Sequence, residues 1–256
     1  MDKSTLARLI ENGRGFLRAE WKLFDTVNTD QDQGLPVPPQ QKAVPDGAGV
    51  LSLPAADTLT LGSMPLREAI GTRKSRRKFG KDPLTLEELS YLLWATQGVR
   101  ERGPIRSMRT VPSGGARHSL ETYLYIARVT GVRPGLWRYQ PLDHAIVRLP
   151  SGDDLAARLD QALQEQLWDA AAVFVWTAIP YRMEWRYSIV SHKVIALDAG
   201  HVCQNLYLAC ESIGCGTCAL GAYDQEMLDK LLGVDGRDEF AIYAAPVGKK
   251  PPGQAQ

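Results

Sequence analysis

The pattern of apolar and polar positions predicts a chain that alternates helices and strands. Helices are predicted over residues 4–24, 66–72, 85–97, 153–166, 189–213 and 225–232. Runs rich in β-branched and aromatic residues predict strands over residues 121–129, 170–179, 217–223 and 239–247. This alternation, without an internal repeat, indicates an α+β fold with a mixed central β-sheet surrounded by helices.

Two of these helices carry specific signals. Thr85 has the position of an N-cap, and Glu88 follows three residues later, which is the spacing of a capping box. The segment 189–213 contains no proline and one internal glycine, and it carries apolar residues throughout. We expect it to form a long, mostly buried helix at the centre of the fold and of a dimer.

The first sixty residues differ from the rest. Ser4 would cap an amphipathic helix that ends at Phe24. Prolines at positions 36, 38, 39 and 45 then forbid a regular helix in residues 28–55, which we interpret as a linker that wraps over another part of the protein. The prediction is therefore an N-terminal helical arm and Pro-rich linker over residues 1–60, and a main domain over residues 61–256.

Composition narrows the class of protein. The 256 residues are 44% hydrophobic and carry a formal net charge of +1, which argues against a nucleic-acid partner because such proteins usually show a strong basic excess. The N-terminus lacks the apolar core of a signal peptide, and the most apolar stretch, residues 170–179, is too short to span a bilayer. We expect a cytoplasmic protein without a membrane partner.

Cysteines and histidines raise the possibility of metal or redox chemistry. The four cysteines occupy positions 203, 210, 215 and 218. A redox Cys-x-x-Cys pair normally precedes a helix, whereas Cys215 and Cys218 lead into a predicted strand, so we expect all four to be structural. His192 and His201 lie about half a helical turn out of phase, so they do not share a ligand face, and we expect no metal site. Asp198 and His201 are close enough to hydrogen-bond on the long helix.

Two short segments suggest a ligand site. Residues 73–79 read Arg-Lys-Ser-Arg-Arg-Lys-Phe, and arginines and a serine at this spacing can hold a phosphate. Residues 111–118 read Val-Pro-Ser-Gly-Gly-Ala-Arg-His, and the glycines can present backbone amides to a ligand. Alone, each segment also fits an ordinary surface turn. Together they indicate a phosphate and flavin site.

An ordered set of motifs resembles the FMN-dependent nitroreductase superfamily, and within it the SagB-type dehydrogenase branch of thiazole/oxazole oxidase-like proteins. The resemblance runs from about Leu66 to Lys250. Its motifs are Arg-x-Ser-x-Arg-x-Phe at 73–79, Leu-Ser-x-Leu-Leu-Trp-Ala-x-Gln-Gly at 89–98, Pro-Ser-Gly-Gly at 112–115, Leu-Asp-Ala-Gly-His at 197–201, Gln-Asn-Leu-Tyr at 204–207 and Tyr-Ala-Ala-Pro-Val-Gly at 243–248.

The resemblance implies FMN as cofactor, held by a nitroreductase-like domain over residues 61–256 in an intertwined homodimer. Arg73 and Ser75 would hold the phosphate and ribityl chain, and Arg77 would stabilise the reduced ring. The partner subunit would supply the loop Pro112, Ser113, Gly114 and Gly115, so that FMN lies at the subunit interface. A backbone amide of the segment with Leu220 and Gly221 would face the reactive N5, and Lys249 and Lys250 would add a late cation to the phosphate.

The candidate catalytic residues depart from the resembled branch. Its azoline oxidases use a Lys-Tyr pair before the long helix, where this chain has Arg186 and Tyr187. Arginine does not titrate in a protein, so Arg186 can position a substrate or stabilise an anion but not act as the base. Tyr187 is either a proton donor or a packing residue beside Trp185. His118 either touches the ligand or is an ordinary loop histidine.

Three functions follow from these observations. The first is two-electron hydride transfer through FMN in the dehydrogenation of a heterocycle, such as an azoline in a modified peptide. The second is NAD(P)H-dependent reduction of nitroaromatic or quinone-like acceptors, which are small molecules. The third is a noncatalytic flavin-binding or peptide-docking subunit.

Overall fold

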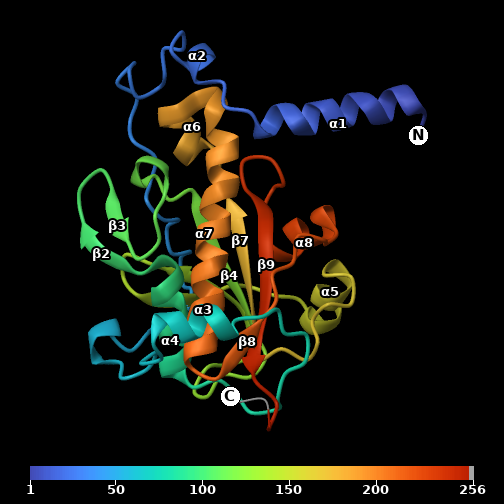
Figure 1. Cartoon of the computed structure of the whole chain (residues 1–256). Helices are drawn as coiled ribbons and strands as arrows, with labels where there is room; N and C mark the ends of the chain where they lie inside the picture. The colour runs from blue at the N-terminus through green and yellow to red at the C-terminus, as the bar shows by residue number, and fades with distance from the viewer. Residues whose placement is uncertain (254–256) are drawn as a thin grey trace.

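A seven-stranded sheet is the framework of the computed structural model, which describes residues 1–253 (Figure 1). Its strands are β1 (Val50–Ser52), β4 (Leu120–Ile126), β5 (Gly135–Gln140), β6 (Ala145–Arg148), β7 (Ala172–Ala178), β8 (Cys215–Thr217) and β9 (Phe240–Lys249). They lie in the order β1-β6-β5-β4-β7-β9-β8, and neighbouring strands pair antiparallel. In the described chain the parallel component of the predicted mixed sheet is one isolated bridge, between Leu84 and Val129.

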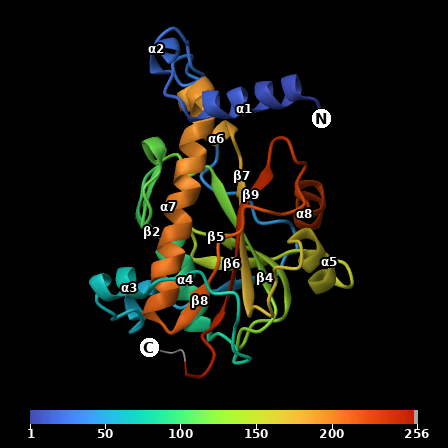
Figure 2. The same cartoon turned by 45° about the vertical axis from the view of Figure 1, so that its right-hand side comes forward.

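Helices cover both faces of this sheet (Figure 2). One face carries α3 (Leu66–Thr72), α4 (Leu86–Gln97) and α7 (Ser191–Ser212), and the other carries α5 (Leu155–Ala162) and α8 (Gln225–Leu232). The short helix α6 (Tyr181–Tyr187) leads from β7 into α7. The predicted α+β architecture with a long helix is confirmed. No helix in residues 1–253 has both the length and the apolar character needed to cross a membrane.

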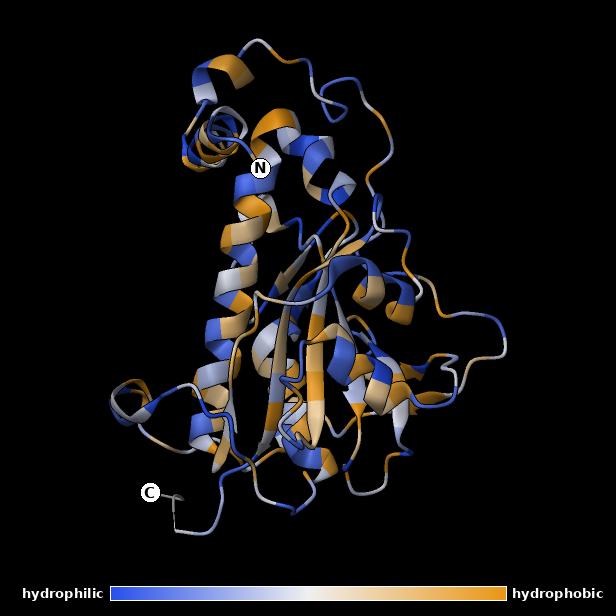
Figure 3. Cartoon of the chain, turned by 90° about the vertical axis from the view of Figure 1, so that its right-hand side faces the viewer, coloured by the Kyte–Doolittle hydropathy of each residue, from blue (hydrophilic) through white to orange (hydrophobic). Residues whose placement is uncertain are grey.

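The central strands supply the core of both layers. Every residue of β7 is buried, and successive side chains point to opposite faces. Phe174 and Trp176 pack under α4 and α7, whereas Val173 and Val175 pack under α5 and α8. In Figure 3 hydrophobic colour runs along a central strand, whereas on the long helix it alternates with hydrophilic colour.

The bounds of several elements agree with the predictions made from local sequence signals. The Thr85 side chain accepts from the Glu88 amide at 3.1 Å, and the Glu88 carboxylate accepts from the Thr85 amide at 2.8 Å, so the capping box predicted for α4 is confirmed. Helices α3 and α8 have the predicted bounds. Strand β9 extends two residues beyond its predicted end and thereby carries Lys249 into the sheet.

Other predictions were wrong in their bounds. The N-terminal helix α1 covers Lys3–Leu17 with Asp2, not Ser4, as its N-cap, and a separate turn, α2, covers Trp21–Phe24. Two glycines, Gly13 and Gly15, weaken the helix before this break. The strand predicted over residues 217–223 is instead β8, and beyond it only Leu220 pairs, with Ala244. A two-stranded hairpin, β2 (Val99–Arg102) and β3 (Ser107–Arg109), was not predicted.

The Pro-rich linker lies against the main domain. Its first part covers α6, where the Gln31 amide donates to the Trp185 carbonyl at 2.9 Å and the Trp185 indole donates to the Leu35 carbonyl at 3.0 Å. Residues 38–45, which we call the strap, cross the sheet, and β1 then pairs with β6 at the sheet edge. By contrast, α1 buries no residue and extends away from the sheet (Figure 1).

Candidate functional site

The basic segment 73–79 runs beside the ends of β8 and β9. The Arg76 amide donates to the Thr217 carbonyl at 2.9 Å, and the Gly80 amide donates to the Lys249 carbonyl at 2.8 Å. Arg76 is buried, whereas Ser75 and Arg77 on either side of it are exposed. The segment therefore turns Ser75 and Arg77 away from the core while Arg76 anchors it.

Tyr207 of α7 links two of the predicted cofactor ligands to Ala219, the residue before Leu220 and Gly221. Its hydroxyl lies 2.8 Å from the Ser75 hydroxyl and accepts from the Ala219 amide at 2.8 Å. The Arg73 guanidinium lies over its ring at 5.1 Å from the centroid, within the range of a cation–π contact. The basic segment and the segment 219–221 thus meet at Tyr207. This residue belongs to the motif at 204–207, and the sequence alone did not indicate its role.

A buried ion cluster fixes the same region from behind. Glu211 of α7 lies 2.7 Å from the Lys250 ammonium and 3.5 Å from the Arg76 guanidinium, and the three side chains are 3%, 2% and 7% exposed. Lys249 forms an ion pair with Glu88 and keeps 23% of its side chain exposed. The structure therefore places both predicted lysines beside the basic segment, with Lys250 enclosed and Lys249 partly accessible.

The segment 219–221 has one open backbone position. The Leu220 amide donates to the Ala244 carbonyl at 2.7 Å, so it is committed to the sheet. Gly221 is exposed, and a Cβ atom added there would meet nothing within 4 Å. Gly221, rather than Leu220, is therefore free to approach a ligand ring. The Arg77 guanidinium lies over the Trp168 ring, 5.7 Å from the centroid.

The loop 112–115 lies at the opposite end of α7. Ser113 donates to Asp198 at 2.6 Å, and the Gly114 amide donates to the same carboxylate at 3.3 Å. Burial raises the pKa of Asp198, although these hydrogen bonds oppose the shift. Asp198 thus holds the glycine loop, and the predicted hydrogen bond to His201 is replaced by these contacts.

Gly115 brings the glycine loop against the two candidate catalytic residues. Its φ is +56°, and a Cβ atom there would lie 2.7 Å from the Tyr187 hydroxyl and 3.0 Å from the Arg186 side chain. Arg186, Gly115, Arg117 and residues of the β2–β3 hairpin line a cavity of about 530 Å³. The Tyr187 ring packs on Trp21 and Phe24 of the arm, which supports the packing alternative for Tyr187.

His118 and the cysteines are structural in this arrangement. His118 is 6% exposed, its ring Nε2 lies 3.1 Å from the Ser107 carbonyl, and burial lowers its pKa to about 3. All four cysteines are buried and unpaired. Burial raises the pKa of Cys203 and of Cys215 to about 12, which disfavours the reactive thiolate.

One chain does not bring the two halves of the predicted site together. Ser113 contacts α7 at Asp198, and Ser75 contacts it at Tyr207. Nine residues of helix correspond to about 14 Å along the axis and half a turn around it. Within one chain, the glycine loop and Ser75 therefore contact different sides of α7.

The donor set around Tyr207 fits a phosphate-bearing flavin. Arg73, Ser75 and Lys249 offer two cations and a hydroxyl, and Arg76 has a buried Nε without a hydrogen-bond partner in the described residues. Gly221 leaves room for a planar ring. Charged donors of this kind favour a phosphate.

Comparisons with known proteins agree with this fit. The model of the Nitroreductase family matches residues 70–249. A nitroreductase-family protein of Methanocaldococcus jannaschii is 34% identical over 187 residues, which are 72% of this chain and 91% of that protein. The trifolitoxin-processing protein TfxB of Rhizobium leguminosarum bv. trifolii is 27% identical over 150 residues, which are 53% of this chain but only 38% of TfxB.

Solved structures show the same fold. A nitroreductase-family protein of Ralstonia eutropha superposes with a TM-score of 0.64 and 28% identity, over 85% of this chain and 99% of that chain. A chain of the Escherichia coli microcin synthetase McbBCD complex with truncated pro-MccB17 bound superposes with a TM-score of 0.61 and 18% identity, over 82% of this chain and 79% of that chain.

Proposed function

Because the chain belongs to the nitroreductase family of flavin oxidoreductases, we propose that it is an FMN-dependent, SagB-type dehydrogenase that acts as a homodimer. The observation that carries this proposal is the meeting of Arg73, Ser75 and the segment 219–221 at Tyr207. Bound FMN would supply the centre that accepts and donates a hydride.

Different residues of the chain would bind different parts of FMN. Arg73 and Ser75 would hold the phosphate and ribityl chain, with Lys249 adding a cation from β9. Lys250, enclosed with Glu211, would support this group from behind rather than touch the ligand. Arg77 would turn from Trp168 toward the pyrimidine edge, where its charge favours the reduced ring, and Gly221 would present its backbone to the reactive edge.

The partner's copy of the loop 112–115 would complete each site. In each chain Asp198 fixes this loop through Ser113 and Gly114, and Gly115 places it beside Arg186. The substrate would then enter the cavity lined by Arg186 and the β2–β3 hairpin. There Arg186 would position the substrate or stabilise a developing anion, because a guanidinium cannot serve as a base.

A modified peptide with an azoline ring is the substrate class we favour. The similarity to a trifolitoxin-processing protein supports it. The replacement of the expected lysine by Arg186 favours a second candidate, an NAD(P)H-dependent reductase of nitroaromatic or quinone-like acceptors. The two differ in whether a nicotinamide can reduce the flavin.

Cofactor content tests the proposal. We expect a yellow protein that releases FMN, and an Arg73→Gln variant that binds FMN about tenfold to a hundredfold more weakly, as loss of a charged hydrogen bond predicts. Arg67→Gln, an equivalent change on the exposed surface of α3, should bind normally. A colourless protein that cannot be reconstituted with FMN would refute the proposal.

Anaerobic reduction separates the candidates. Bleaching by NADPH would favour the reductase, and resistance to NADPH together with reduction by an azoline peptide would favour the dehydrogenase. A protein that binds FMN but turns over with no donor and acceptor would instead be a noncatalytic subunit.

A further inference from the structure

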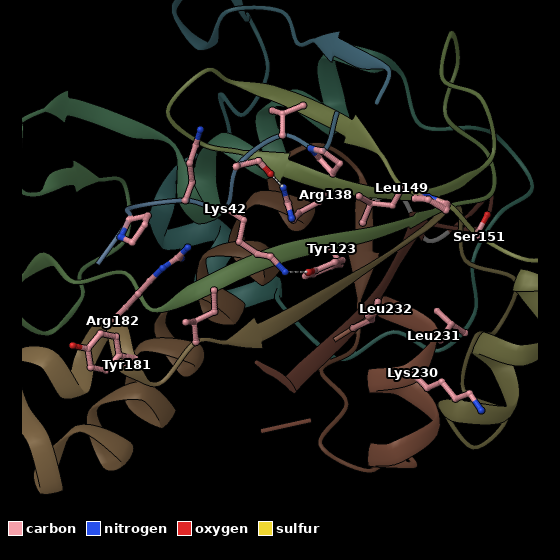
Figure 4. A pocket seen from close by; sticks show the side chains of 18 of the residues that line it. Lys42, Tyr123, Arg138, Leu149, Ser151, Tyr181, Arg182, Lys230, Leu231 and Leu232 are labelled. Carbon is pink, nitrogen blue, oxygen red and sulfur yellow. Dashed lines mark hydrogen bonds between the residues drawn. The ribbon is translucent and has the colours of Figure 1, made fainter. Parts of the chain in front are cut away.

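A second, larger cavity lies on the face of the sheet that carries α5 and α8. It has a volume of about 1250 Å³ and lies between the strap, the loop 149–152 and the end of α8 (Figure 4). Its floor includes Tyr123 of β4 and Arg138 of β5. The residues assigned to the flavin site do not line it.

The ionisable residues that line this cavity, apart from tyrosine, are all basic. They are Lys42, Arg138, Arg158, Arg182 and Lys230, and no aspartate or glutamate lines it. The whole chain has a formal net charge of only +1. The cavity therefore concentrates positive charge far beyond the average of the protein.

Two buried carboxylates beneath the cavity compensate part of this charge. Glu239 pairs with Lys42, whose ammonium also lies 3.0 Å from the Tyr123 hydroxyl (Figure 4). Glu121 lies 2.6 Å from the Arg182 guanidinium and 4.0 Å from that of Arg138. These two carboxylates pair with Lys42, Arg138 and Arg182, so that Arg158 and Lys230 remain without an acidic partner in the described residues.

Three of these cations have polar groups without a hydrogen-bond or ion-pair partner in the described residues. The Arg182 side chain is buried, with 3% exposure, and its Nη1 has no hydrogen-bond partner in the described residues. Arg158 and Lys230 are exposed and form no ion pair with any residue in 1–253. Buried donors without a partner are rare in folded proteins because they lose their hydration. An anionic ligand in the cavity would compensate Arg158 and Lys230, whereas the Arg182 Nη1 is enclosed within the protein.

The rest of the wall is apolar. Pro39 and Val44 of the strap, Leu149, Ile179 and Leu231 face the same space. Such a surface binds hydrocarbon through the hydrophobic effect, while a few charged groups fix the orientation of the ligand. The strap is itself held in place, since the Lys42 amide donates to Glu121 at 3.0 Å and the Ala43 carbonyl accepts from Arg138 at 2.5 Å.

We propose that this cavity is a second ligand site, which binds an organic anion with an apolar body. The carboxylate or phosphate of the ligand lies at the end of the cavity that Arg158 and Lys230 line, and its apolar part packs against the strap and α8. This site is separate from the flavin site and does not depend on the function proposed for it.

Displacement of a fluorescent anion tests the proposal on the full chain. The probe is 8-anilinonaphthalene-1-sulfonate, and the competitors are octanoate, octyl phosphate and octanol. We expect octanoate or octyl phosphate to displace the probe at a concentration at least about tenfold below that of octanol, because octanol lacks the charge. The tighter of the two anions identifies the head group, and equal displacement by octanol would overturn the proposal.

Paired variants locate the site. Arg158→Gln combined with Lys230→Gln should weaken binding of the anionic competitor by about threefold to thirtyfold, since both cations are exposed. Lys3→Gln combined with Arg8→Gln removes the same two charge types from α1 and should change nothing. Equal effects of the two pairs would show that only net charge matters and would contradict the proposal.

A cavity-filling variant gives an independent check. Val44 is 41% exposed on the strap, so Val44→Trp can place an indole in the cavity without disturbing the core. This variant should lose most of the fluorescence enhancement while its unfolding midpoint stays within about 2 °C of the parent, as expected for a surface change. Undiminished binding would place the probe elsewhere and overturn the proposal.

Discussion

Glu211→Gln should destabilise the protein strongly, because Glu211 is the carboxylate that the structure places between Arg76 and Lys250. It lies 2.7 Å from the Lys250 ammonium and 3.5 Å from the Arg76 guanidinium, and none of the three side chains is more than 7% exposed. The substitution keeps the shape of the side chain but removes its charge. Two enclosed cations would then face a neutral amide.

The size of the effect follows from burial. Removing one partner of a buried ion pair costs about 3–5 kcal/mol, since the remaining charge loses its compensation without regaining water. For a domain of this size, 1 kcal/mol changes the unfolding midpoint by roughly 2–4 °C. The expected decrease is therefore between about 6 and 20 °C, and chemical denaturation should give the matching loss of free energy of unfolding.

Two further variants isolate the cause. Glu87→Gln makes the same chemical change at an exposed position of α4 and should shift the midpoint by less than about 2 °C. Adding Lys250→Met to Glu211→Gln removes one of the two uncompensated cations and should recover about half of the lost stability. If Glu211→Gln were no more destabilising than Glu87→Gln, the cluster would not anchor the basic segment.

Three other predictions concern the loop, its histidine and the ring-facing cation. Burial lowers the pKa of His118 to about 3 in the folded state, so the stability that its neutral form contributes is complete above the unfolded pKa near 6.5 and falls as the pH decreases toward 3. Urea denaturation should show a loss of about 2–3 kcal/mol in the free energy of unfolding between pH 7 and 4.5. His118→Gln should lose less over the same pH range. Gly115→Ala should lower activity more than stability, because the new methyl group displaces Arg186 and Tyr187. Steady-state kinetics and thermal unfolding of the same variant test this prediction, and a larger loss of stability than of activity would contradict it. Arg77→Ala should lower the flavin reduction potential more than it weakens FMN binding, and an unchanged potential in flavin-loaded protein would contradict the role of that cation.

Elements with local signals could be predicted from the sequence, and elements that depend on distant partners could not. The capping box at Thr85 is complete within four residues, and α8 is capped by Asp224, whose side chain accepts from the Met227 amide at 2.9 Å. Strand β5 was missed because Arg138 lies in its middle. That arginine is 3% exposed and depends on Glu121 and the Ala43 carbonyl, which are far away in the sequence.

The candidate site shows the same limit. Arg73, Ser75 and the glycine loop could be found from motifs, because the residue types themselves indicate a phosphate and a ligand-facing backbone. Tyr207, Asp198 and Glu211 could not be assigned roles, since each acts through a contact with a segment at least 84 positions away. Their burial and helix phase become informative only when the fold is known.

Helix α7 explains why the two halves of the site lie apart in one chain. Asp198 and Tyr207 are nine positions apart, so they lie on opposite sides of the helix and hold the glycine loop and the phosphate-binding segment separately. On the same stretch of α7, Leu197, Gly200, His201 and Gln204 are exposed at the spacing of one helix face. Leu197 is 54% exposed, and at Gly200 a Cβ atom would meet nothing within 4 Å, so a second α7 can approach closely there. This exposed face is where the two copies of the proposed homodimer would pair, because it leaves room for a second helix between the two halves of the site.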